Sequence, residues 1–167
     1  MIAALVVIAS LLAPACYQMP VEAPVVDPFR APACAYCAGN RGLEYRTTPG
    51  QPVVAAATGT VAFNGVVAGV RYVVVRQADG LLATYGQLVR AEVVVGDAVS
   101  QGGPIGAASD QFYFGLREDG RYVDPAPRLG VVLFRPRLLP TDGGPARAPP
   151  IPRRACAVDR ASSAWHR

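Results

Sequence analysis

The feature that most constrains the fold is a series of short, Val-rich apolar segments between residues 50 and 125, separated by Gly and Asp-Gly turns. The series has no sustained helical period, and β-branched residues favour strands. Asp79-Gly80 and Asp119-Gly120 each separate two such segments, which is a strong hairpin signal. The stretch therefore predicts an all-β domain, either a small barrel or a sandwich.

The segments on either side of this domain differ from it in composition. Residues 1–15, MIAALVVIASLLAPA, resemble an export signal peptide with a small-residue cleavage site, although no Arg or Lys precedes the apolar run. A buried helix and a short interfacial anchor are the alternatives. We expect residues 16–38 to be a Pro- and Cys-rich lead-in, residues 39–135 to be the β domain, and residues 136–167 to be a flexible, mostly disordered Pro/Arg-rich tail.

Four cysteines support export, because an even count in an exported protein favours disulfides. The preferred pairing is Cys34–Cys37, within CAYC, together with Cys16–Cys156, which would join the two ends of the chain. A redox-active CAYC or half of a zinc site are alternatives. Cys16 directly follows the export signal, so lipoprotein cleavage is a rival to simple secretion, but the Leu usual three residues before such a cysteine is missing. We expect membrane attachment only if Cys16 is lipidated or the signal is retained.

The basic residues exclude several classes of function. All 16 are Arg, and the chain contains no Lys. VVVGDAVSQGGPIG resembles the turn of biotinyl and lipoyl carriers, but those carriers need an acceptor lysine. Residues 141–167 are basic while the rest of the chain is nearly neutral, so the basic, aromatic-rich face of a nucleic-acid-binding protein is missing. The single histidine, His166, lies outside the β domain, so no serine there has a partner base.

Several phrases of the β domain follow one another in an informative order. They are GLEY with TPGQPVVAAATGTV, then ATYGQL, VVVGDAVSQGGPIG and FYFGLREDGRYVDP. Over about residues 24–130 this order resembles the LytM/lysostaphin-type peptidoglycan metallopeptidases. The resemblance implies a duplicated hybrid motif fold, with the barrel-sandwich architecture of small antiparallel β domains. It also implies an extracytoplasmic location, secreted or associated with the cell envelope, and zinc in an active member.

The residues at the zinc-site positions depart from the family pattern. The first metal histidine falls on Asn40 and the aspartate on Glu44, while the later histidines fall on Gln87, Gln111 and Tyr113. Hydrolytic zinc needs three good ligands and an open position for water. Glu44 could ligate, but neutral amides are poor donors and a phenol must first lose its proton. The pattern therefore predicts a degenerate site with no zinc and no other cofactor.

Strand geometry still predicts a cleft at these positions. Gln111 and Tyr113 are two residues apart and point to one face of a strand, and we expect Tyr85 and Gln87 beside them. The hydrogen-bonding groups of such a cleft suit an amide- and sugar-rich ligand such as wall peptide. The alternative is that these positions have drifted and make only local hydrogen bonds. The other face of the strand would point to the core and carries Phe112, Phe114 and Leu116.

Three functions compete at this point. The first is an exported, non-catalytic module that binds peptidoglycan or regulates a cell-wall hydrolase, and the missing ligands favour it over an enzyme. The second is a peptidoglycan metalloendopeptidase with an atypical or residual zinc site, which rests on Glu44. The third is an interaction protein whose arginine-rich tail contacts anionic wall polymers or lipid head groups.

Overall fold

The computed structural model describes residues 16–34, 36–133 and 153–156. The predicted export signal, residues 1–15, and most of the predicted tail lie outside these residues. Within the described part, no helix is long and apolar enough to cross a membrane. The one helical element in these described ranges is a short 3-10 turn, η1 (Ala126–Arg128).

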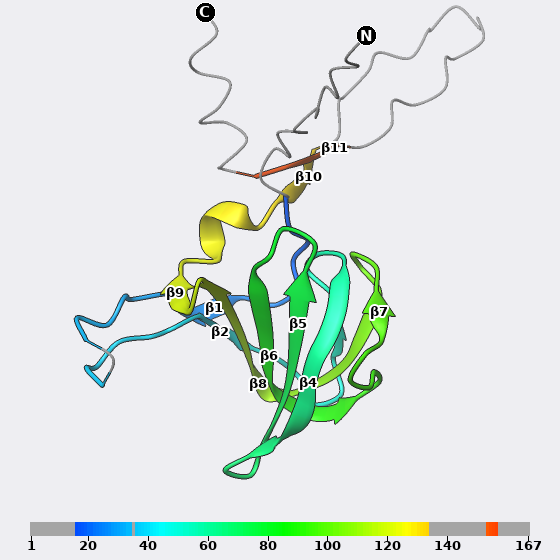
Figure 1. The fold of residues 1–167 in the computed structure, drawn as a ribbon, viewed down its shortest axis with the longest axis horizontal. Coiled ribbons are helices and arrows are strands. Elements are labelled where there is room, and N and C mark those ends of the chain that lie inside the picture. The colour runs from blue at the N-terminus through cyan, green and yellow to red at the C-terminus, as the bar shows by residue number, and fades with distance from the viewer. Residues whose placement is uncertain (1–15, 35, 134–152, 157–167) are drawn as a thin grey trace, which may run out of the picture.

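The fold is a curved, antiparallel, nine-stranded sheet with the order β1-β2-β8-β6-β5-β4-β7, and β3 and β9 also pair with β8. In Figure 1, β4, β5 and β6 lie side by side, and β7 lies beside β4. The all-β prediction is confirmed. The strands of the sheet are β1 (Val25–Asp27), β2 (Leu43–Arg46), β3 (Pro52–Val54), β4 (Gly59–Val67), β5 (Val70–Gln77), β6 (Leu82–Ala91), β7 (Ala98–Val99), β8 (Pro104–Glu118) and β9 (Arg121–Val123).

A second, two-stranded sheet pairs β10 (Val131–Leu133) with β11 (Arg153–Ala155). Strand β11 falls within the predicted Pro/Arg-rich tail. This short part of the tail therefore pairs as an antiparallel strand with β10, near the end of the predicted β domain. It lies above the main sheet in Figure 1.

Strand β8 separates the core from the opposite face of the sheet. It pairs with β3 through its first half and with β2 and β9 through its second half, while β6 pairs with it on the other side. The predicted core face is confirmed, because Phe112, Phe114 and Leu116 are all fully buried. They pack in one cluster with the buried tyrosines Tyr45 and Tyr85.

Both predicted hairpins are present. β5 and β6 are joined across Asp79-Gly80, and β8 and β9 across Asp119-Gly120. Sequence analysis did not identify a third hairpin, in which β4 and β5 pair along their whole length and project at the bottom of Figure 1. Its tip is Ala68-Gly69, where both residues have positive φ, 49° and 81°. Two positive φ values in a two-residue loop match the twist of the strands, but they favour Gly or Asn over Ala.

The N-terminal lead-in is attached to the domain at several points. Tyr17 forms a parallel bridge with Leu129, and its hydroxyl donates to Asp79 Oδ2 at 2.6 Å. The predicted Cys34–Cys37 disulfide is present. The Cys16–Cys156 pairing stays a prediction.

The hairpin tip yields a stability prediction. We expect Ala68→Gly to raise the free energy of unfolding by about 0.5–1 kcal/mol, since it relieves a left-handed backbone at an alanine. The opposite substitution at the neighbouring residue, Gly69→Ala, should lower the free energy of unfolding by at least about 1 kcal/mol. A Cβ there meets open space, so the substitution adds only backbone strain. Urea unfolding of both variants measures the two shifts. A destabilised Ala68→Gly variant would contradict the assigned turn.

Candidate functional site

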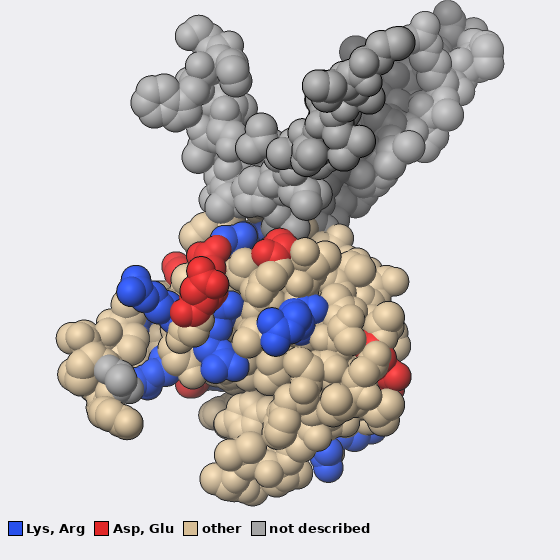
Figure 2. Space-filling model, viewed as in Figure 1, with Lys and Arg blue, Asp and Glu red and all other residues tan. Residues whose placement is uncertain are grey.

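A cleft of about 600 Å³ opens on the face of the sheet opposite the core. The space-filling view shows the surface hollowed between the projecting β4–β5 hairpin and the part of the molecule that carries β9, with basic side chains above the hollow (Figure 2). Its walls come from six strands of the main sheet. The lining residues are Glu44, Phe63, Val67, Tyr72, Val74, Thr84, Gln87, Gln111, Phe112, Tyr113, Arg117 and Tyr122.

The structure brings together four of the five predicted site residues, namely Glu44, Gln87, Gln111 and Tyr113, which all line the cleft. Backbone pairing explains the proximity of two of them, because Glu44 on β2 lies directly opposite Tyr113 on β8. The fifth residue, Asn40, is not among the lining residues.

A bulge places Gln87 in the cleft. In a regular strand, Tyr85 and Gln87 would share one face. The β6–β8 register shifts between Gly86 and Leu88, and Gln87 itself has a φ of 62°. A bulge of this kind re-aims a side chain. The expectation that Tyr85 lies beside the cleft is wrong, since Tyr85 is fully buried in the core, where its hydroxyl accepts a hydrogen bond from the Ala56 amide at 2.8 Å.

The Tyr113 side chain packs against the sheet at two glycines, and the Tyr72 ring packs at a third. A Cβ added at Gly42 would lie 2.6 Å from a carbon of the Tyr113 ring, and one at Gly115 would collide with the Tyr113 hydroxyl. At Gly86 an added Cβ would lie 3.3 Å from the Cβ of Tyr113 and 2.6 Å from the ring of Tyr72. A Cβ closer than 3.0 Å would force a neighbouring atom to shift, so these glycines make the room that the two tyrosine rings occupy. The result is an aromatic floor of Tyr72 and Tyr113.

The Tyr113 hydroxyl is a hydrogen-bond donor to the backbone. It donates to the carbonyl of Arg41 at 3.0 Å. Burial raises the pKa of Tyr113 above its ordinary value of 10.0, and nearby Arg117 and Arg41 only partly oppose this shift. At neutral pH the phenol is therefore protonated, and a protonated phenol is not a zinc ligand.

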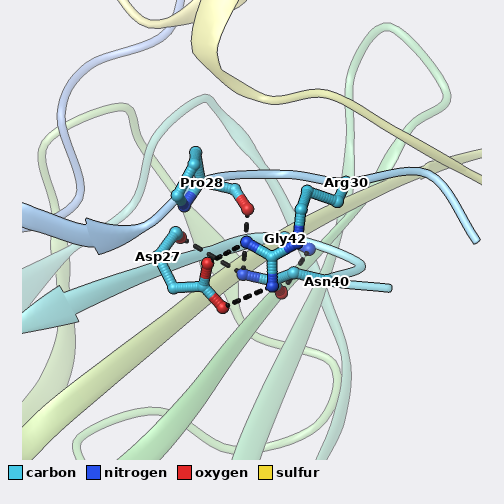
Figure 3. A network of polar contacts seen from close by, with 5 residues as sticks. All are labelled: Asp27, Pro28, Arg30, Asn40 and Gly42. Atoms are coloured by element: carbon cyan, nitrogen blue, oxygen red, sulfur yellow. Dashed lines mark hydrogen bonds and ion pairs between the residues drawn. The ribbon is translucent and has the colours of Figure 1, made fainter. Parts of the chain in front are cut away.

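Asn40 is a structural residue that joins the lead-in to the start of β2 (Figure 3). Its backbone exchanges two hydrogen bonds with Arg30. Its side-chain amide donates to the carbonyls of Asp27 and Pro28, both at 3.2 Å, and its Oδ1 accepts from the Gly42 amide at 3.3 Å. All of its polar groups are thus engaged in holding the chain.

The chemistry of these donors does not fit a catalytic zinc ion. Asn40 is engaged by backbone, Gln87 and Gln111 are neutral amides, and Tyr113 keeps its proton. Glu44 is the carboxylate among the lining residues. In the described ranges, no three His, Cys, Asp or Glu side chains gather in a group that could hold a metal. These donors therefore do not support a hydrolytic step at a zinc ion.

Sequence reasoning missed several residues of the cleft. Arg117 could have been found, because Gln111, Tyr113, Gly115 and Arg117 alternate along one strand and share a face. Tyr72 could not, because its place depends on the pairing of β5 with β6, where Tyr72 lies opposite Gly86. The remaining missed residues come from β4, β5, β6 and β9 and are Phe63, Val67, Val74, Thr84 and Tyr122.

Comparison with known proteins identifies the family. Residues 38–125 match Peptidase family M23, and this segment contains every predicted site residue. The chain belongs to peptidase family M23. Members of this family therefore provide the relevant comparison for both the fold and the cleft.

Two curated relatives and one solved structure illustrate the family likeness. An uncharacterized protein of Mycobacterium tuberculosis is 33% identical over 132 residues, which cover 71% of this chain and 53% of that protein. The murein hydrolase activator NlpD of Escherichia coli is 28% identical over 117 residues, covering 65% of this chain and 30% of NlpD. Helicobacter pylori Csd3 shares the fold with a TM-score of 0.61 at 22% identity, over 69% of this chain and 35% of Csd3. The chain thus spans about half the length, or less, of the relatives it matches.

The network around Asn40 yields a second prediction. We expect Asn40→Ala to lower the free energy of unfolding by about 2–3 kcal/mol, because it removes three buried or partly buried side-chain hydrogen bonds and leaves two carbonyls without their donor. Arg30→Gln is the matched control. It removes only the exposed Arg30–Asp27 ion pair, which solvent screens, so the loss of stability should be much smaller than that of Asn40→Ala. Equal losses in the two variants, measured by urea unfolding, would contradict the structural role of Asn40.

Proposed function

We propose that this chain is a non-catalytic cell-wall module of the M23 family, which acts outside the cytoplasm by binding peptidoglycan or by regulating a wall hydrolase. The observation that carries the proposal is the cleft itself. Four of the positions that resemble the family's zinc site line it, and their polar groups are two amides, a protonated phenol and one carboxylate. These groups can bind a ligand by hydrogen bonds, whereas they do not form a hydrolytic zinc centre.

Hydrogen bonding within the chain supports binding over simple drift. Among the described residues, the side-chain amides of Gln87 and Gln111 have no hydrogen-bond partner, and neither has the Glu44 carboxylate. Their donors and acceptors therefore face the cleft rather than local backbone. Aromatic walls with a few convergent polar groups are typical of ligand sites.

Similarity to a known regulator supports the regulatory function. NlpD of Escherichia coli is a murein hydrolase activator, and it is 28% identical to this chain over 117 residues. An export signal in residues 1–15 and an envelope location are part of the proposal. Membrane attachment would require lipidation of Cys16 or retention of that signal.

The alternative is a peptidoglycan metalloendopeptidase with an atypical zinc site. It rests on family membership and on the presence of Glu44 in the cleft.

The proposal is tested by zinc content, hydrolysis and wall binding measured on the same preparation. We expect far less than one zinc ion per chain, no release of soluble fragments from purified peptidoglycan, and retention of the protein on that peptidoglycan. The double variant Gln87→Ala/Gln111→Ala should weaken retention by about tenfold, as expected for two modest hydrogen bonds. Thr60→Ala, an exposed polar residue of β4 outside the cleft lining, should leave retention unchanged.

Each result has a separate meaning. Stoichiometric zinc with hydrolysis would contradict the non-catalytic function and establish the alternative. Without retention, faster cleavage by an added wall hydrolase would support the regulatory arm alone. Neither retention nor stimulation of a hydrolase would refute the proposal.

A further inference from the structure

The β9 end of the cleft has a chemistry that the family positions do not explain. Arg117 lines this end of the cleft and lies opposite Tyr122 of β9. It is four residues beyond Tyr113 along β8, so the Cα atoms of the two residues are about 13 Å apart. Arg117 therefore belongs to a different part of the cleft from the row that contains Glu44 and Tyr113.

The guanidinium of Arg117 is not neutralised by the described part of the chain. Other arginines pair with carboxylates of the chain, as Arg90 does with Glu92 at 2.7 Å and Arg128 with Glu118 at 3.7 Å. Arg117 has no such pair among the described residues, and its Nε is buried there without a hydrogen-bond partner. A buried N–H group without a partner is costly, so an acceptor that reaches this Nε would offset that cost.

A second arginine strengthens the positive field at the same place. The guanidinium carbons of Arg41 and Arg117 both lie 5.8 Å from the centroid of the Tyr122 ring. Two cations on one ring repel each other, and an anion near them relieves that repulsion. Both arginines also act electrostatically on Tyr113, which shows that their charge reaches the aromatic floor.

The aromatic floor continues from this positive end. The ring of Tyr113 lies between Arg117 and the row of Gly86 and Tyr72, and the glycines beneath keep the floor flat. Such a surface takes the apolar side of a small residue or a sugar ring. The cleft thus has a positively charged end beside the aromatic floor.

We propose that Arg117, with Arg41 and Tyr122, forms a carboxylate-binding subsite, and that the apolar part of the same ligand lies on Tyr72 and Tyr113. The ligand class is a short peptide with a free carboxylate beside small apolar side chains. This inference rests on the proposed function, since wall peptide supplies such a carboxylate. The planar guanidinium is suited to a carboxylate because its N–H groups bind both oxygens at once.

The test compares two probes, N-acetyl-D-alanyl-D-alanine and its C-terminal amide, by calorimetric titration of the full chain. We expect the acid to bind roughly ten- to a hundredfold more tightly than the amide, as for a hydrogen-bonded charged group. Arg117→Gln should abolish this preference, and Arg117→Lys should leave part of it. Arg121→Gln, which removes the same charge from an exposed position of β9 outside the cleft lining, should retain it.

A further variant separates the two halves of the subsite. Tyr72→Ala should weaken acid and amide by the same factor, because the floor contacts the part that the probes share. Thermal unfolding of every variant confirms that the domain is folded. Equal binding of acid and amide by the wild type, no binding of the acid at millimolar concentration, or an unchanged preference in Arg117→Gln would overturn the subsite.

Retention on peptidoglycan distinguishes this inference from the proposed function. Retention without any acid preference would leave the wall-binding function standing and refute the subsite. An Arg117-dependent preference without retention would support the subsite and count against wall binding, with a carboxylate of a protein partner as the ligand.

Discussion

The alternation of side chains along β8 is the constraint on which the rest of the structure depends. This strand of 15 residues pairs with four others, and its second half separates two chemically different faces. Phe112, Phe114 and Leu116 are fully buried on one face, and burial of each such side chain stabilises the fold by about 1.5–3 kcal/mol. A shift of register by one residue would expose all three, so the core also fixes which residues face the cleft.

On the cleft face, the tyrosine rings occupy space that the glycines leave open. The Tyr113 ring needs the absence of a Cβ at Gly42 and Gly115, and Tyr72 needs it at Gly86. Asn40 likewise suits its place, because it uses its amide and backbone to hold the lead-in. Tyr113 and Asn40 are therefore integrated into the packing and hydrogen bonding of the domain.

Sequence reasoning reached the fold because its signals are local. Val-rich segments and Asp-Gly turns determine strands and hairpins, and alternation between Gln111 and Tyr113 determines which side chains share a face. It failed where the outcome depends on pairing between strands. The bulge at Gln87 separates that residue from Tyr85, and no local pattern indicates it. The position of Asn40 depends on contacts with Asp27 and Pro28, which precede it by 13 and 12 residues.

The central claim is that the face of β8 that bears Gln111, Tyr113 and Arg117 is a ligand-binding surface. The most direct measurement is nuclear magnetic resonance of the isotopically labelled protein, titrated with soluble peptidoglycan fragments. We predict that the backbone amide signals of Gln87, Gln111, Tyr113 and Arg117 shift together and saturate with one binding constant. Saturable shifts confined to residues outside the cleft, with these four signals unmoved, would contradict the account.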